Sequence, residues 1–63
     1  MRIDRVKFAA ALARADIKLI DLAEKSGVSR VTLTAVKTGK RCSPDTAKKI
    51  AAALGVKLES LLA

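Results

Sequence analysis

The sequence contains no histidine, tryptophan or tyrosine, and it has one cysteine, Cys42, and one phenylalanine, Phe8. A single cysteine excludes a disulfide within the chain, and without histidine no recognisable cluster of metal ligands can be assembled. We therefore expect no metal ion and no cofactor. Cys42 is interpreted as a small, half-buried loop residue in a protein of the reducing cytosol, because a redox switch would need support such as a second cysteine.

Long apolar runs are also missing. No stretch of the chain approaches the roughly 18 apolar residues of a membrane span. The N-terminus, with Arg2 ahead of a small-residue run over residues 8–13, could be mistaken for a secretion signal, but Asp4, Arg5 and Lys7 interrupt it. The apolar run is also too short for the apolar region of about 7–15 residues that such a signal needs. We expect a soluble, cytoplasmic protein with no membrane partner.

Acidic residues are scarce, at six against 13 Lys and Arg, so the formal net charge is +7. On so small a protein this charge attracts polyanions, of which nucleic acid is the commonest. The 63 residues make a single domain, 1–63, whose limited core leaves no room for a catalytic cleft. We expect neither enzyme activity nor a small-molecule ligand. Because half the residues are hydrophobic and almost none aromatic, the core should be aliphatic and the fold all-α.

Helix start and stop signals divide the chain into five segments. Asp4 can cap a first helix, with Phe8 and Leu12 on its inner face, and Ile17 follows as a buried connector. Lys18 is a poor cap for the second helix, since it lacks a hydroxyl or carboxylate. The clearest start is Ser43, followed by a proline and an acid. The first predicted helix runs from the Asp4 cap to about residue 15, the second from about residue 19 to 26, and the third over residues 30–37. The fourth opens at Ser43-Pro44 and stops at Gly55, and Leu58, Leu61 and Leu62 mark a short terminal helix.

The segment from Leu22 to Arg41 places two short amphipathic helices around one turn. Gly27 can adopt the left-handed backbone that the turn requires. Val28 then fills the corner between the helices, and the Ser29 hydroxyl can cap the helix that begins at Arg30. This arrangement is typical of a helix-turn-helix that reads DNA.

These residues resemble the Cro and phage-repressor type of helix-turn-helix, often called XRE-like. The matching positions run over nearly the whole chain: Leu22-Ala23, Gly27-Val28-Ser29, Thr32-Leu33, Val36, Gly39-Lys40, Pro44, Ile50-Ala51 and Leu54-Gly55-Val56. The resemblance implies a compact, lambda-repressor-like bundle of five helices. The second and third would form the DNA-reading unit, with the third in the major groove.

The outer face of helix 30–37 consists of side chains that Leu33 and Val36 leave pointing outward, and we expect these to face base edges: Arg30, Val31, Thr34 and Ala35. Arg30 can donate to both O6 and N7 of a guanine, and its alternative is a phosphate contact. Val31 can contact a thymine methyl, and its alternative is a partly buried spacer.

A second group should hold the DNA backbone. The resemblance implies phosphate contacts for residues that flank the recognition helix: Ser29, Thr38, Lys40 and Arg41. Lys18 lies beside the N-terminus of the second helix, which itself attracts anions, and Lys37 should be free to reach DNA. The remaining lysines of the C-terminal half are interpreted as solvated surface charges: Lys48, Lys49 and Lys57.

The chain departs from the family at two places. Leu19 stands where many relatives have a glutamine that braces the recognition helix and holds a phosphate. Leu12 and Lys37 stand where relatives often pair an arginine with a glutamate. Replacing both halves of a buried ion pair with an apolar contact can be neutral for stability. The departures therefore bear on docking more than on the fold.

We expect a sequence-specific transcriptional regulator, a repressor of prokaryotic or phage origin that is nucleoid-associated when bound and acts as a homodimer on a two-fold operator. Leu61 and Leu62 are assigned to the dimer interface, because the C-terminus has more leucine than one short helix turns inward. One alternative is the antitoxin of a toxin–antitoxin pair. Another, kept open by Leu19, is a protein-interaction module that has lost DNA binding. A membrane-active peptide is disfavoured, because such helices need no tertiary core.

Overall fold

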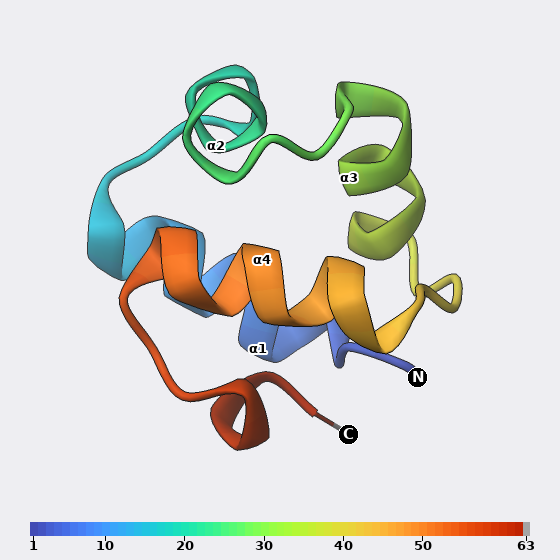
Figure 1. Ribbon diagram of the computed structural model, residues 1–63. Coiled ribbons are helices and arrows are strands. Elements are labelled where there is room, and N and C mark those ends of the chain that lie inside the picture. Colours follow the sequence, from blue (N-terminus) through green and yellow to red (C-terminus); the bar gives the residue numbers. More distant parts are fainter. Residues whose placement is uncertain (63) are drawn as a thin grey trace.

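Four α-helices and one short 3₁₀ helix make up the fold, which a computed structural model describes for residues 1–62 (Figure 1). The elements are α1 (Arg5–Ala15), α2 (Leu19–Ser26), α3 (Arg30–Lys37), α4 (Pro44–Leu54) and η1 (Leu58–Leu61). The all-helical class is confirmed over these residues, but the count of five α-helices is not. The predicted domain 1–63 includes residue 63, which lies outside the described part. Within that part, no helix is both long and apolar enough to cross a membrane.

The last predicted helix is a single 3₁₀ turn for a physical reason. Leu62 has an extended backbone, with φ −79° and ψ 149°, and it forms an isolated antiparallel bridge with Ile3. An extended residue cannot continue a helix, so the turn ends at Leu61. The four residues of η1 instead form the tighter pattern common in short pieces, in which the Ser60 amide donates to the Lys57 carbonyl at 3.0 Å.

Three of the four α-helices begin at the capping residue that the sequence predicts. The side chains of Asp4, Ser29 and Ser43 accept hydrogen bonds from backbone amides in the first turns of α1, α3 and α4, at 2.8, 3.2 and 3.1 Å. Gly27 ends α2 with φ 73°. Lys18 makes no side-chain capping bond at the start of α2, as expected.

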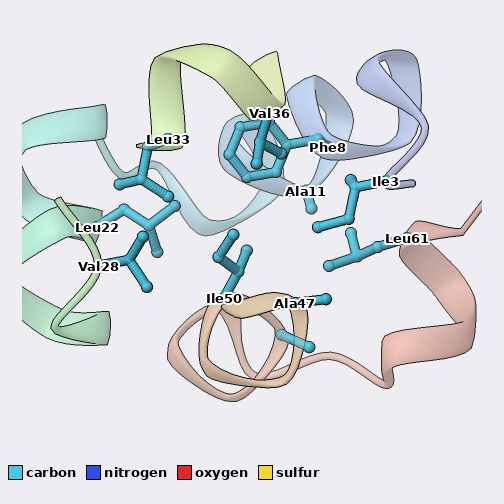
Figure 2. Close-up of a cluster of buried hydrophobic side chains, with 11 residues drawn as sticks. Ile3, Phe8, Ala11, Leu22, Val28, Leu33, Val36, Ala47, Ile50 and Leu61 are labelled. Carbon is cyan, nitrogen blue, oxygen red and sulfur yellow. The ribbon is translucent and has the colours of Figure 1, made fainter. Parts of the chain in front are cut away.

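Aliphatic side chains from all five elements form one core around Phe8 (Figure 2). Leu12 and Ile17, which were predicted to point inward, are only half-buried, as is Leu54 on α4, and Ala11 rather than Leu12 is the buried partner of Phe8 on α1. Helix α1 packs against α3, α4 and η1 with the side that carries Phe8 and Ala11, and Leu12, one residue further round the helix, lies at the edge of that contact. The largest fully buried side chains are Phe8, Ile3, Leu22, Leu33, Ile50, Leu61 and Val36.

The segment before α1 is anchored at both sides, which the sequence did not predict. Ile3 is 1% exposed and lies in the core. The Met1 carbonyl accepts from the Cys42 amide at 2.9 Å, and the Asp4 amide donates to the Leu61 carbonyl at 2.8 Å. The N-terminal segment therefore lies between η1 and the loop that follows α3.

Candidate nucleic-acid interface

The turn between α2 and α3 is held by packing and by hydrogen bonds. Val28 is 8% exposed and fills the corner, as predicted. The Ser26 hydroxyl donates to the Leu22 carbonyl at 2.6 Å and accepts from the Val28 amide at 3.2 Å. Figure 1 shows α2 end-on and α3 from the side, so the two axes cross steeply. The orientation of α3 is therefore set by buried contacts of the turn and of α2.

Helix α3 has one buried face and one open face. Leu33 and Val36 are fully buried, as predicted. On the opposite side Arg30 and Thr34 are exposed, and Val31 is 82% exposed. The interpretation of Val31 as a partly buried spacer is therefore wrong. Burying one face anchors the helix and leaves the other face free to contact a ligand.

A shallow groove of about 590 Å³ runs along this open face, and we call it the recognition groove. It brings together all four predicted base-reading residues and two of the predicted backbone contacts. Its lining residues are Arg30, Val31, Thr34, Ala35, Thr38 and Lys40. Ala35 is half-buried at its floor, whereas the others reach solvent. The groove thus offers one guanidinium, one ammonium, two hydroxyls and the methyl groups of Val31 and Ala35.

The two hydroxyl groups predicted to hold the DNA backbone already have partners. Ser29 Oγ accepts from the Thr32 amide and lies 2.9 Å from Thr32 Oγ1, and either of these hydroxyls can donate. Thr38 Oγ1 donates to the Ala35 carbonyl at 2.9 Å. A phosphate oxygen only accepts hydrogen bonds, so Thr38 must give up this bond before it can donate to DNA.

Positive charge surrounds the recognition groove. From Ser29 to Ser43 there is no acidic residue, and the basic residues there are Arg30, Lys37, Lys40 and Arg41, all exposed. Among the described residues the one salt bridge joins Lys49 and Asp45 on α4, at 3.4 Å. The cations around α3 are therefore not neutralised by acidic side chains and remain available to an external anion.

Three predicted site residues lie away from α3 and the loop that follows it. Lys18 is exposed on a separate concavity at the junction of α1 and α2, with Asp16 and Asp21 beside it. Leu61 is 1% exposed within the core, and Leu62 is half-buried. The side chain of Leu61 is thus used inside this chain, because the core reaches further toward the C-terminus than the sequence suggested.

The departures from the family pattern fit the packing. Leu19 and Leu12 are half-buried against the core, and Lys37 is exposed at the end of α3. Helix α1 contacts α3. An arginine at position 12 and a glutamate at position 37, the pair that relatives often have, would need this contact to meet. Both leucines therefore extend the aliphatic core.

Sequence reasoning missed two arginines near the end of α3. Arg2 Nε donates to the Gly39 carbonyl at 3.1 Å, and Arg5 lines the same concavity beside Gly39. Their positive charge was visible in the sequence, but their position depends on how the N-terminal segment packs. No local pattern predicts that long-range contact.

Cys42 is half-buried in the loop after α3, as expected. Burial raises the pKa of its thiol, and the N-terminal ammonium of Met1 opposes this with a smaller lowering. The thiolate, which is the reactive form, is thus less populated than for a free cysteine. This environment gives no support to a redox switch.

Comparison with known families matches residues 8–61 to the helix-turn-helix model HTH_3. Searches against curated proteins and solved structures found no significant match. The matched range begins inside α1 and ends with η1, so it includes the α2–α3 turn and every residue of the recognition groove. The chain therefore belongs to the helix-turn-helix family HTH_3, the XRE type of DNA-binding regulators.

Proposed function

We propose that this protein is a sequence-specific transcriptional repressor that binds double-stranded DNA with α3 in the major groove. The observation that carries the proposal is the recognition groove. Its lining combines hydrogen-bonding and apolar groups on the open face of a firmly anchored helix, at the position where helix-turn-helix proteins contact base edges. Repression follows from occupancy of the operator and needs no catalytic group.

Each of the four predicted base-reading residues in the groove has a role that its chemistry allows. Arg30 stands at the exposed start of α3 and donates to O6 and N7 of a guanine. Val31 and Ala35 present methyl groups to a thymine methyl. Thr34 has both a hydroxyl and a methyl, so it can contact either a polar base edge or a thymine.

Phosphate contacts set the register of α3 on the duplex. Lys37, Lys40 and Arg41 follow one another along the end of α3 and its loop, and all three are exposed. Ser29 and Lys18 contact the backbone near the starts of α3 and α2. These contacts supply affinity that depends on salt and carries no sequence information.

A two-fold operator requires two copies of the chain. The molecule measures 22 × 21 × 18 Å, whereas half-sites one helical turn apart lie about 34 Å from each other. One copy therefore reads one half-site. We assign the dimer contact to the C-terminal end, with Leu62 as the half-buried side chain that a second copy would cover. In sedimentation, Leu62→Ser should dissociate the dimer, and an unchanged mass would place the interface elsewhere.

Selection of bound sites from random duplexes tests the proposed function. The parent should enrich a palindromic consensus, and Arg30→Ala should relax it at one position in each half-site. Lys48→Ala is a matched control, because Lys48 is an exposed cation on α4 outside the recognition groove, and it should return the parent consensus. No enrichment of any sequence by the parent would contradict sequence-specific binding.

A further inference from the structure

The N-terminal segment places two arginines next to the C-terminal end of α3. Ile3 anchors the segment in the core, and the bond between the Met1 carbonyl and the Cys42 amide ties it to the loop after α3. Arg2 and Arg5 lie on either side of this anchor, and both are exposed. The packing of Ile3 and the bond between Met1 and Cys42 therefore hold the backbone that carries both arginines.

The guanidinium of Arg2 is oriented by a single hydrogen bond. Its Nε donates to the Gly39 carbonyl at 3.1 Å. The guanidinium carries five N–H donors, so four of them, on the two Nη atoms, remain for another acceptor. A cation near the last carbonyls of a helix is also favoured by the helix dipole. Arg2 thus presents an aligned pair of donors beside the end of α3.

The concavity that holds these arginines adjoins the recognition groove. It has a volume of about 260 Å³ and is lined by Arg2, Ile3, Asp4, Arg5, Thr38 and Gly39. Thr38 lines the recognition groove as well, so the two hollows share a wall. Asp4 is the one acid of the lining, and its Oδ1 is occupied by the amides of Val6 and Lys7, at 2.8 and 3.4 Å.

We infer that Arg2 and Arg5 together bind a phosphate of the DNA backbone next to the base pairs that α3 contacts. The inference rests on the proposed function. A phosphodiester fits because a guanidinium donates two parallel hydrogen bonds to it, and because, within residues 1–62, no acidic side chain pairs with either arginine. The N-terminal segment is then part of the DNA-binding surface in addition to its role in the core.

The salt dependence of DNA binding tests the inference. Arg2→Gln removes the charge but keeps an N–H donor for the Gly39 carbonyl, so it separates phosphate binding from local structure. Each lost phosphate contact should lower the log–log salt slope by about 0.9, so the affinity ratio of parent to variant falls about 3.5-fold for a four-fold rise in salt. Arg5→Gln should act similarly, and both variants should weaken binding to selected and shuffled duplexes by the same factor.

Arg14→Gln is the matched control, because Arg14 is an exposed arginine in the last turn of α1 beside Val56 and Ser60. It should keep the parent slope. An Arg2→Gln slope equal to that of the parent would overturn the inference, and a lowered Tm with that unchanged slope would show a purely structural role. If the parent itself binds no duplex, the proposed function fails as well. If the parent binds DNA and the Arg2→Gln and Arg5→Gln variants have the parent salt slope, only the assignment of a phosphate to Arg2 and Arg5 is contradicted.

Discussion

Lys18 occupies the N-cap position of α2 without capping it, although its backbone is suited to a capping residue. Its φ and ψ are −88° and 160°, close to the −64° and 151° of Ser29, which caps α3. The first helical bond of α2 runs from the Leu22 amide to the Lys18 carbonyl at 2.9 Å, so the three amides between them lack an intrahelical acceptor. We predict that Lys18→Ser is more stable than the parent.

The magnitude follows from the caps that already exist. Exchanging a serine cap for alanine costs about 1 kcal/mol, so Lys18→Ser should exceed Lys18→Ala by that amount. For a domain of this size, 1 kcal/mol corresponds to about 4–8 °C in Tm. Thermal unfolding followed by circular dichroism measures both variants. Equal Tm values for Lys18→Ser and Lys18→Ala would refute the reasoning.

The two Lys18 variants also test whether Lys18 contacts DNA. Both remove the same positive charge, so both should weaken DNA binding equally and lower the salt slope by about 0.9 if Lys18 holds a phosphate. If Lys18→Ser is more stable than the parent but binds DNA more weakly, the lysine at position 18 serves DNA binding at the expense of helix capping. Unchanged slopes in both variants would instead remove Lys18 from the interface.

Three further predictions test the packing of the reading unit. Leu33→Ala should lower the free energy of unfolding by about 2–5 kcal/mol in urea titrations. Val31→Ala, on the exposed face of α3, should change it by less than about 0.5 kcal/mol. Similar losses in both variants would mean that the buried face of α3 has been assigned wrongly. Gly27→Ala should cost about 1–2 kcal/mol from its positive φ alone, since nothing lies within 4 Å of an added Cβ, and a neutral result would contradict that conformation. Lys37→Glu should weaken DNA binding and slightly lower stability, and adding Leu12→Arg should restore part of the stability, with a coupling of about 0.5–3 kcal/mol in a double-mutant cycle. Additive losses would show that positions 12 and 37 do not face each other.

Helix boundaries could be predicted because capping acts within a single turn. Asp4, Ser29 and Ser43 cap the helices that the sequence assigned to them, and Gly27 adopts the positive φ that its turn requires. The inner face of α3 was equally readable, since apolar and polar residues alternate there at helical spacing.

The sequence did not predict which side of α1 faces the core, because α1 carries apolar residues all around its circumference. Val6 is 69% exposed while Ala11 is buried, so the pattern alone does not show which side faces the core. The N-terminal segment was not predictable at all. Ile3 lies in the core and pairs with Leu62, and the Cys42 amide donates to the Met1 carbonyl, so contacts between distant parts of the chain place Arg2 beside Gly39.

The sequence predicted the residues that line the recognition groove but not every hydrogen bond among them. Arg30, Val31 and Thr34 project outward as helical phase requires. The bond from the Thr38 hydroxyl to the Ala35 carbonyl depends on how the last turn of α3 closes, which no spacing in the sequence records.

Base reading by α3 is tested most directly by one ratio of affinities. The ratio compares the selected operator with a shuffled duplex at one salt concentration, for the parent and for a variant with both Arg30→Ala and Thr34→Ala. Because a good base contact contributes about 1–3 kcal/mol of discrimination, the ratio should fall by about 5- to 150-fold while binding to the shuffled duplex changes far less. An unchanged ratio, with equal weakening on both duplexes, would show that these side chains hold only the DNA backbone.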